Sequence, residues 1–110
     1  MAHLPDRPTL ADLQSYQAAI CKERGWDQTS DLEAFLLFTE EIGELAKAIR
    51  NRRELYQEQG KSPKSGELEG EFADVLSYLM ELANRFGIDL EQVYRAKEEV
   101  NAGREWGSGG

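Results

Sequence analysis

The chain has 110 residues, of which 40% are hydrophobic and 31% charged, and it carries a net charge of −8. This length fits one globular domain. The acidic balance argues against a nucleic-acid partner, because non-specific binding needs basic surface to neutralise phosphates. No window approaches the roughly 20 apolar residues of a membrane span, so no membrane partner is expected. The single cysteine, Cys21, allows no internal disulfide, which favours a cytoplasmic location.

The first predicted helix covers residues 10–24. Thr9 and Asp12 have the spacing of a capping box, in which each side chain bonds the backbone of the other. Gly25 is placed to end the helix in the left-handed conformation that glycine adopts easily. These local signals define both ends of the helix.

The second predicted helix begins after Ser30, which forms a capping box with Glu33. Its apolar repeat extends to about Gln57, and Gly60 stops it. Residues 60–66, GKSPKSG, are predicted to form a loop because Gly, Pro and Ser dominate them.

Two further helices are predicted over 67–86 and 89–103, with Gly87 ending the first of them. Residues 107–110, GSGG, have the composition of a flexible tail. No strand pattern is found. Short connections between amphipathic helices predict an all-α fold, an antiparallel four-helix bundle completed by oligomerisation.

Three glutamates interrupt the apolar repeat of the second helix. Glu41 and Glu44 fall on a semi-apolar flank of that repeat, whereas Glu40 falls on the opposite, solvated side. Charged side chains seldom lie beside a core without a compensating partner. The rest of the sequence is therefore expected to supply that partner.

A second acid pair, Glu71 and Asp74, flanks the apolar stripe of the third helix. If the two helices pack antiparallel, the two pairs meet, and four carboxylates stay ionised together only around a cation. A hard divalent ion with oxygen ligands, Mg²⁺ or Mn²⁺, fits this set. The alternative is that both pairs are ordinary solvated helix charges. A di-iron centre is a weak rival, since the only histidine, His3, lies outside the helices.

The order of these motifs resembles a known family. The segments "EEIGE" (Glu40, Glu41, Glu44) and "EFAD" (Glu71, Asp74) resemble the EExxE…ExxD signature of MazG-like nucleotide pyrophosphohydrolases, members of the all-α NTP pyrophosphohydrolase superfamily. "KERGWD" and "KEEVNAGREW" resemble elements before and after that signature. The resemblance covers most of the chain and implies a single domain over residues 1–106.

The resemblance implies hydrolysis of a nucleoside triphosphate between its α and β phosphates, giving a monophosphate and pyrophosphate. The side chains implied to hold Mg²⁺ are Glu41, Glu44, Glu71 and Asp74. Glu40 matches the first glutamate of the signature and, with Glu41, is a candidate catalytic residue that orients or deprotonates the attacking water.

Five other residues are candidates for substrate binding. The fourth helix continues its stripe as Lys97, Asn101 and Arg104, which could reach triphosphate oxygens, although basic residues also favour a helix C-terminus. Trp26 could stack on a nucleobase or simply close the end of the first helix. Tyr78 lies one turn beyond Asp74 and could line the pocket or pack in the core.

The sequence thus predicts a Mg²⁺-dependent nucleoside triphosphate pyrophosphohydrolase that serves in nucleotide-pool house-cleaning. The alternatives are a non-catalytic helical interaction or regulatory module, and a hydrolase that releases inorganic phosphate. Consecutive apolar residues over 35–37 cannot all face one neighbouring helix, which predicts a homodimer or homotetramer.

Overall fold

The described residues of this computed structural model, 2–53 and 67–104, form four α-helices and one short 3₁₀ helix, with no strand among them. The elements are α1 (Leu10–Arg24), η1 (Trp26–Gln28), α2 (Asp31–Arg52), α3 (Glu67–Arg85) and α4 (Leu90–Ala102). The predicted all-α class is confirmed. The predicted end of the second helix near Gln57, the loop over 60–66 and the tail over 107–110 lie outside the described residues.

Local capping explains where the first two helices begin. The Thr9 hydroxyl accepts a hydrogen bond from the Asp12 N–H at 3.0 Å, and the Asp12 carboxylate accepts one from the Thr9 N–H. Ser30 and Glu33 repeat this arrangement at the start of α2. Gly25 ends α1 at a φ of +71°, a left-handed conformation that a side chain would strain.

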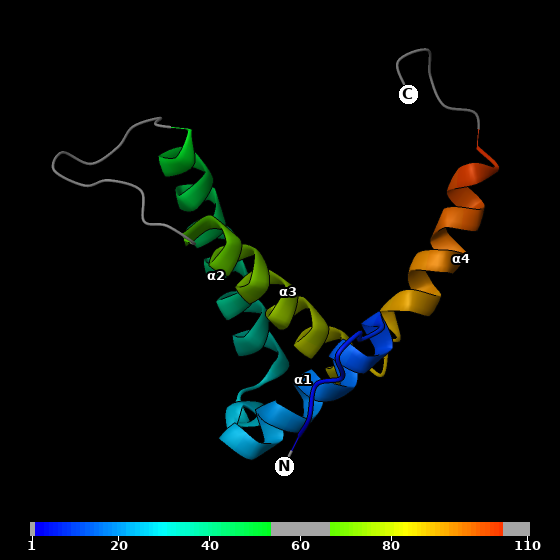
Figure 1. Cartoon of the computed structure of the whole chain (residues 1–110), viewed down its shortest axis with the longest axis horizontal. Coiled ribbons are helices and arrows are strands. Elements are labelled where there is room, and N and C mark those ends of the chain that lie inside the picture. Colours follow the sequence, from blue (N-terminus) through cyan, green and yellow to red (C-terminus); the bar gives the residue numbers. More distant parts are fainter. Residues whose placement is uncertain (1, 54–66, 105–110) are drawn as a thin grey trace, which may run out of the picture.

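Helices α2 and α3 lie antiparallel and form the most extensive helix pair in the molecule (Figure 1). Helix α1 packs across α3, and η1 connects α1 to the start of α2. Helix α4 contacts α1 and extends away from the α2–α3 pair (Figure 1). The site-forming part of the described chain is therefore α1, η1, α2 and α3.

Hydrogen bonds from one buried glutamine fix the start of α4. Gln14 on α1 accepts a hydrogen bond from the Leu90 N–H at 2.8 Å and donates to the Ile88 carbonyl at 2.9 Å. Asn84 on α3 donates to the Gln14 carbonyl at 2.9 Å and accepts from its side-chain amide at 3.1 Å. These bonds join α1, α3 and α4 at one point and set the direction in which α4 leaves.

The hydrophobic core of the described residues is small, and no large side chain among them is fully buried. The buried apolar residues are Ile20, Cys21, Ala34, Ala48, Met80 and Ala83. By contrast, Leu32, Phe35 and Leu36 on α2 and Phe72 on α3 are each at least half exposed. Much of the apolar surface of α2 and α3 is thus left uncovered within this chain. No helix in the described part of the chain is long and apolar enough to cross a membrane.

We expect the capping box at Ser30 to contribute measurably to stability. Ser30→Ala removes the hydroxyl that accepts from the Glu33 N–H, so it should lower the free energy of unfolding by about 1 kcal/mol. Urea unfolding followed by circular dichroism measures this. Ser15→Ala, at an exposed position within α1, is the control and should not destabilise the protein. Equal stability of both variants and wild type would contradict the capping role.

Candidate metal and nucleotide site

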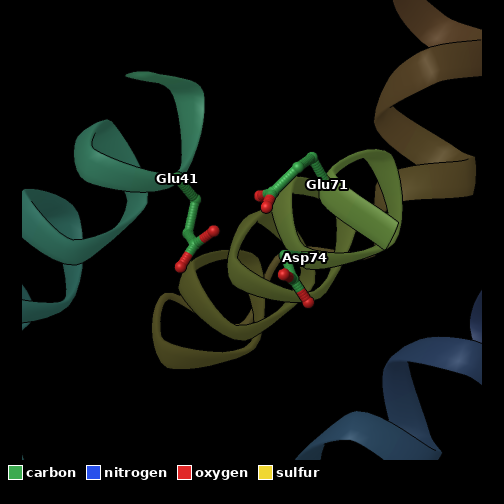
Figure 2. A group of neighbouring side chains, drawn as sticks. All are labelled: Glu41, Glu71 and Asp74. Carbon is green, nitrogen blue, oxygen red and sulfur yellow. The ribbon is translucent and has the colours of Figure 1, made fainter. Parts of the chain in front are cut away.

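Three carboxylates from two helices converge at the α2–α3 interface. Glu41 projects from α2, and Glu71 and Asp74 project from α3 toward the same space (Figure 2). One oxygen of each lies within 4.8 Å of the others. The i, i+3 spacing places both α3 acids on one face, and the antiparallel packing brings that face to Glu41.

This set of donors fits a divalent cation. Oε2 of Glu71 is buried and has no hydrogen-bond partner among the described residues, which is costly for a carboxylate unless a positive charge compensates it. Opposite ligands of Mg²⁺ lie about 4.2 Å apart, so small side-chain movements would bring the three oxygens of this site into its coordination shell. Carboxylates are the ligands that Mg²⁺ and Mn²⁺ prefer.

The electrostatics of Glu41 point the same way. Burial raises the pKa of Glu41, and the negative charges of Asp74 and Glu71 raise it further. A smaller contribution comes from Glu44, one turn along α2. Without a cation, the fold therefore disfavours the ionised form of Glu41.

The structure brings together three of the four predicted metal ligands. Glu44 is exposed and does not belong to the group of three, although its charge acts on Glu41. Glu40 is also exposed on α2, as its helical position predicted. The predicted roles of Glu40 and Glu44 stay predictions.

A pocket of about 550 Å³ opens beside the carboxylates. Glu41 and Asp74 line one part of it, and Tyr78 follows one turn along α3. Burial raises the pKa of Tyr78, and the charge of Glu41 raises it further, so the phenol keeps its proton. The pocket thus extends from the acidic group to a wall of apolar and aromatic residues.

That wall is built by α1, η1 and the start of α2. Ile20 and Leu37 supply apolar surface, and Trp26 lines the pocket with its ring half exposed. The Arg24 guanidinium lies 4.8 Å from the centre of the Trp26 ring, a cation–π distance. An exposed, electron-rich aromatic ring beside a pocket suits stacking against a planar ligand.

The predicted basic residues of the fourth helix lie elsewhere. No α4 residue lines this pocket among the described residues. Lys97 and Arg104 are exposed, and Gly103 ends α4 before Arg104. Asn101 is half-buried on α4. Within one chain, therefore, these side chains and the three carboxylates are not brought together.

Sequence reasoning missed five polar residues of the pocket, which are Gln17, Arg24, Thr29, Ser77 and Glu81. Gln17 is a buried amide in the apolar stripe of α1, and its side chain donates to the Cys21 thiol at 3.4 Å. Glu81 lies seven residues after Asp74 and three after Tyr78, on the same flank of α3. The signal that could have found Glu81 is its helical spacing from Asp74 and Tyr78, and the signal for Gln17 is a polar amide within an apolar stripe.

A helical fold with converging carboxylates beside an aromatic pocket defines a candidate metal-dependent nucleotide hydrolase. Residues 29–100 match the family model of the MazG nucleotide pyrophosphohydrolase domain. The chain belongs to the MazG nucleotide pyrophosphohydrolase family.

Individual relatives agree with this assignment. The chain is 35% identical over 100 residues to dCTP pyrophosphatase 1 of Homo sapiens, a match that covers 88% of this chain and 59% of the human protein. It is 30% identical over 95 residues to YvdC of Bacillus subtilis, an uncharacterized protein, covering 82% of this chain and 90% of YvdC. The chain thus corresponds to less than two thirds of the length of the human relative.

A solved structure has the same architecture. The "putative pyrophosphatase YPJD" from Bacillus subtilis superposes with a TM-score of 0.73 at 31% sequence identity. The match covers 92% of this chain and all of that one. The likeness therefore extends over nearly the whole described fold.

The raised pKa of Glu41 predicts a pH-dependent gain in stability for Glu41→Gln. A carboxyl whose pKa is raised by folding contributes its full stability below the unfolded pKa, about 4.3, and loses it as the pH rises through the folded value. Without metal, the variant should melt at a higher temperature than wild type near pH 7, and the difference should vanish below about pH 4. Differential scanning calorimetry in chelator measures this.

The control for that experiment is Glu69→Gln, which changes an exposed glutamate of α3. It should leave the stability of the metal-free protein nearly unchanged at both pH values. A Glu41→Gln protein that melts at or below the wild-type temperature throughout the pH range would contradict the electrostatic description of the site.

Proposed function

We propose that this protein hydrolyses nucleoside triphosphates to the monophosphate and pyrophosphate, with Mg²⁺ or Mn²⁺ as cofactor. The observation that carries the proposal is the meeting of Glu41, Glu71 and Asp74 at the edge of an aromatic-lined pocket. The family of the chain and the names of its relatives support the proposal.

The two parts of the pocket suit the two ends of a nucleotide. Phosphates are anionic and would bind beside the carboxylates only with a cation between them. The base would then lie toward Trp26, whose half-exposed ring can stack on it. The human relative is named for dCTP, so dCTP is the first substrate to test.

Bound at this site, the cation would neutralise phosphate oxygens and lower the pKa of a water. Glu41, Glu71 and Asp74 would bind the cation and balance its charge. Glu44, one turn along α2 from Glu41, would be the fourth ligand. Glu41 or Glu40 accepts the proton of the attacking water as its oxygen bonds the α phosphorus and the bond to the β phosphate breaks.

Other side chains would orient the substrate. The Tyr78 phenol, kept protonated by its surroundings, can donate a hydrogen bond to a phosphate or sugar oxygen. Lys97, Asn101 and Arg104 would bind triphosphate oxygens, since each offers N–H donors that suit them. Because Lys97 and Asn101 lie on α4 and Arg104 just after it, and none of them lines the pocket of its own chain, they would act on the site of another copy.

We therefore propose that the active form is a homodimer or homotetramer. Leu32, Phe35, Leu36 and Phe72 are each at least half exposed, and large exposed apolar surface on a small protein marks an interaction site. A second chain would cover it and bring its α4 toward the carboxylates. We take residues 1–106 as one catalytic domain, with nucleotide-pool house-cleaning in the cytoplasm as its role.

Product analysis tests the proposed reaction. With Mg²⁺ and a panel of ordinary nucleoside triphosphates, wild type should yield monophosphate and pyrophosphate. Glu41→Gln and Asp74→Asn should lose more than about 100-fold in kcat/KM, because even residues behind the ligands of a metal site change activity by about 10–100-fold. Chromatographic separation of products measures this, and Glu69→Gln, exposed on the same helix as Asp74, should retain activity.

The outcomes separate the alternatives. Release of inorganic phosphate in place of pyrophosphate would show that the protein hydrolyses a different bond of the triphosphate from the one proposed. The absence of any turnover, together with no Mg²⁺-dependent nucleotide binding, would favour a non-catalytic interaction module.

Oligomerisation is tested by sedimentation velocity at micromolar concentration. We expect a species of at least twice the 12.5 kDa chain mass. Phe35→Glu, which places a charge on the exposed apolar face of α2, should dissociate it, whereas Ser15→Glu on exposed α1 should not. A wild-type protein found only at 12.5 kDa would overturn this part of the proposal.

A further inference from the structure

Glu81 places a further carboxylate in the pocket, separate from the three converging acids. It lines the pocket two helical turns beyond Asp74, about 10 Å along the axis of α3. Its side chain is only 13% exposed. Burial raises the pKa of the Cys21 thiol, and the negative charge of Glu81 raises it further. Glu81 therefore lies near Cys21, toward the C-terminal end of α1.

Arg85 holds this carboxylate in place. Its guanidinium donates to Oε1 of Glu81 at 3.0 Å, and also to the Thr29 carbonyl at 2.7 Å and the Thr29 hydroxyl at 2.9 Å. The Arg85 side chain is 14% exposed, so this is a sheltered pair tied to the backbone just after η1. A carboxylate fixed this way has a defined direction.

The position of Glu81 determines what it can bind. A carboxylate offers about four acceptor sites and no donor, so Arg85 leaves acceptor capacity available to the pocket. The Glu81 carboxylate would repel phosphate, and none of the three converging acids lies at this end of the pocket to share a cation with it. A ligand group that faces Glu81 must therefore donate a hydrogen bond.

We propose that Glu81 is a specificity-determining residue that accepts a hydrogen bond from an exocyclic amine of the nucleobase. This inference rests on the proposed function, which puts the phosphates at the three carboxylates and the base beside Trp26. Glu81 and Trp26 line the same pocket, and Arg85 ties Glu81 to Thr29, three residues after Trp26. The pocket thus favours 4-aminopyrimidines such as cytosine over 4-oxopyrimidines such as uracil and thymine.

The expected size of the preference follows from the hydrogen bond. A 4-oxo group would place one acceptor against another and leave a sheltered carboxylate without its donor. Loss of a hydrogen bond to a charged group lowers kcat/KM by about tenfold or more. Glutamine can donate as well as accept, so Glu81→Gln should relax the preference between the two bases.

The competing explanation is that Glu81 and Arg85 form only a structural ion pair along α3. The chain contains a matched pair with the same i, i+4 spacing, Glu91 and Arg95 on α4, at 3.3 Å. That pair is largely exposed and lines no part of the pocket. Glu91→Gln is therefore the control for removing a Glu–Arg pair from a helix.

The first test compares kcat/KM for dCTP and dUTP in wild type, Glu81→Gln and Glu91→Gln. Wild type should prefer dCTP by at least about tenfold, and Glu81→Gln should reduce this ratio by about tenfold. Glu91→Gln should keep the wild-type ratio. A Glu81→Gln enzyme that loses activity on both substrates equally, and so keeps the ratio, would overturn the inference and leave the proposed function standing.

A second test uses wild-type protein alone, so it does not depend on the variant folding. The deoxynucleoside triphosphate of pyrimidin-2-one lacks the 4-amino group, and the N4,N4-dimethyl analogue of dCTP cannot donate from it. Both should be hydrolysed at least about tenfold less efficiently than dCTP. Equal turnover of all three would overturn the inference. If wild type releases pyrophosphate from no nucleotide, the proposed function fails and this inference fails with it.

Discussion

The close approach of Glu41, Glu71 and Asp74 is the constraint on which the rest of the site depends. Two helices that pack antiparallel have placed like charges within 4.8 Å of one another, and one oxygen of Glu71 is buried without a partner. Such an arrangement opposes folding unless a cation joins it. In the proposed function, the same feature that costs stability in the free protein would form the site for a divalent ion and, through that ion, for phosphate. Stability and function oppose each other at this one point of the α2–α3 interface.

The remaining elements position the aromatic wall of the pocket relative to the three carboxylates. The left-handed turn at Gly25 redirects the chain from α1 into η1, which places Trp26 on the pocket wall. Arg85 then ties the residue after η1 to α3, so the aromatic end and the acidic end belong to one rigid frame. In the proposed function, a nucleotide bound here would have its phosphates at the carboxylates and its base beside Trp26. Helix α4 is directed away from the pocket by the hydrogen bonds of Gln14, which is why the proposed phosphate contacts from α4 require a second chain.

Local chemistry made much of the fold predictable from the sequence. The capping boxes at Thr9 and Ser30 and the turn at Gly25 depend on residues within a few positions of each other, and the structure has them where they were expected. The meeting of Glu41 with Glu71 and Asp74 was predictable from helical spacing. The exclusion of Glu44 from this group was not predictable, because it depends on the register in which α3 packs against α2. The direction of α4 was equally hidden, because Gln14 and Leu90 are 76 residues apart. No periodic pattern encodes such a contact.

Binding of Mn²⁺ is the most direct test of the central claim, that three carboxylates from two helices act together on one cation. Titration followed by electron paramagnetic resonance counts bound Mn²⁺ in wild type, in Glu71→Gln and in Glu69→Gln. The structure predicts saturable binding in wild type and in Glu69→Gln, and a loss of affinity of at least about tenfold in Glu71→Gln. Equal Mn²⁺ affinity in all three proteins would contradict the assignment of the site, because the buried oxygen of Glu71 would then have no cation to bind.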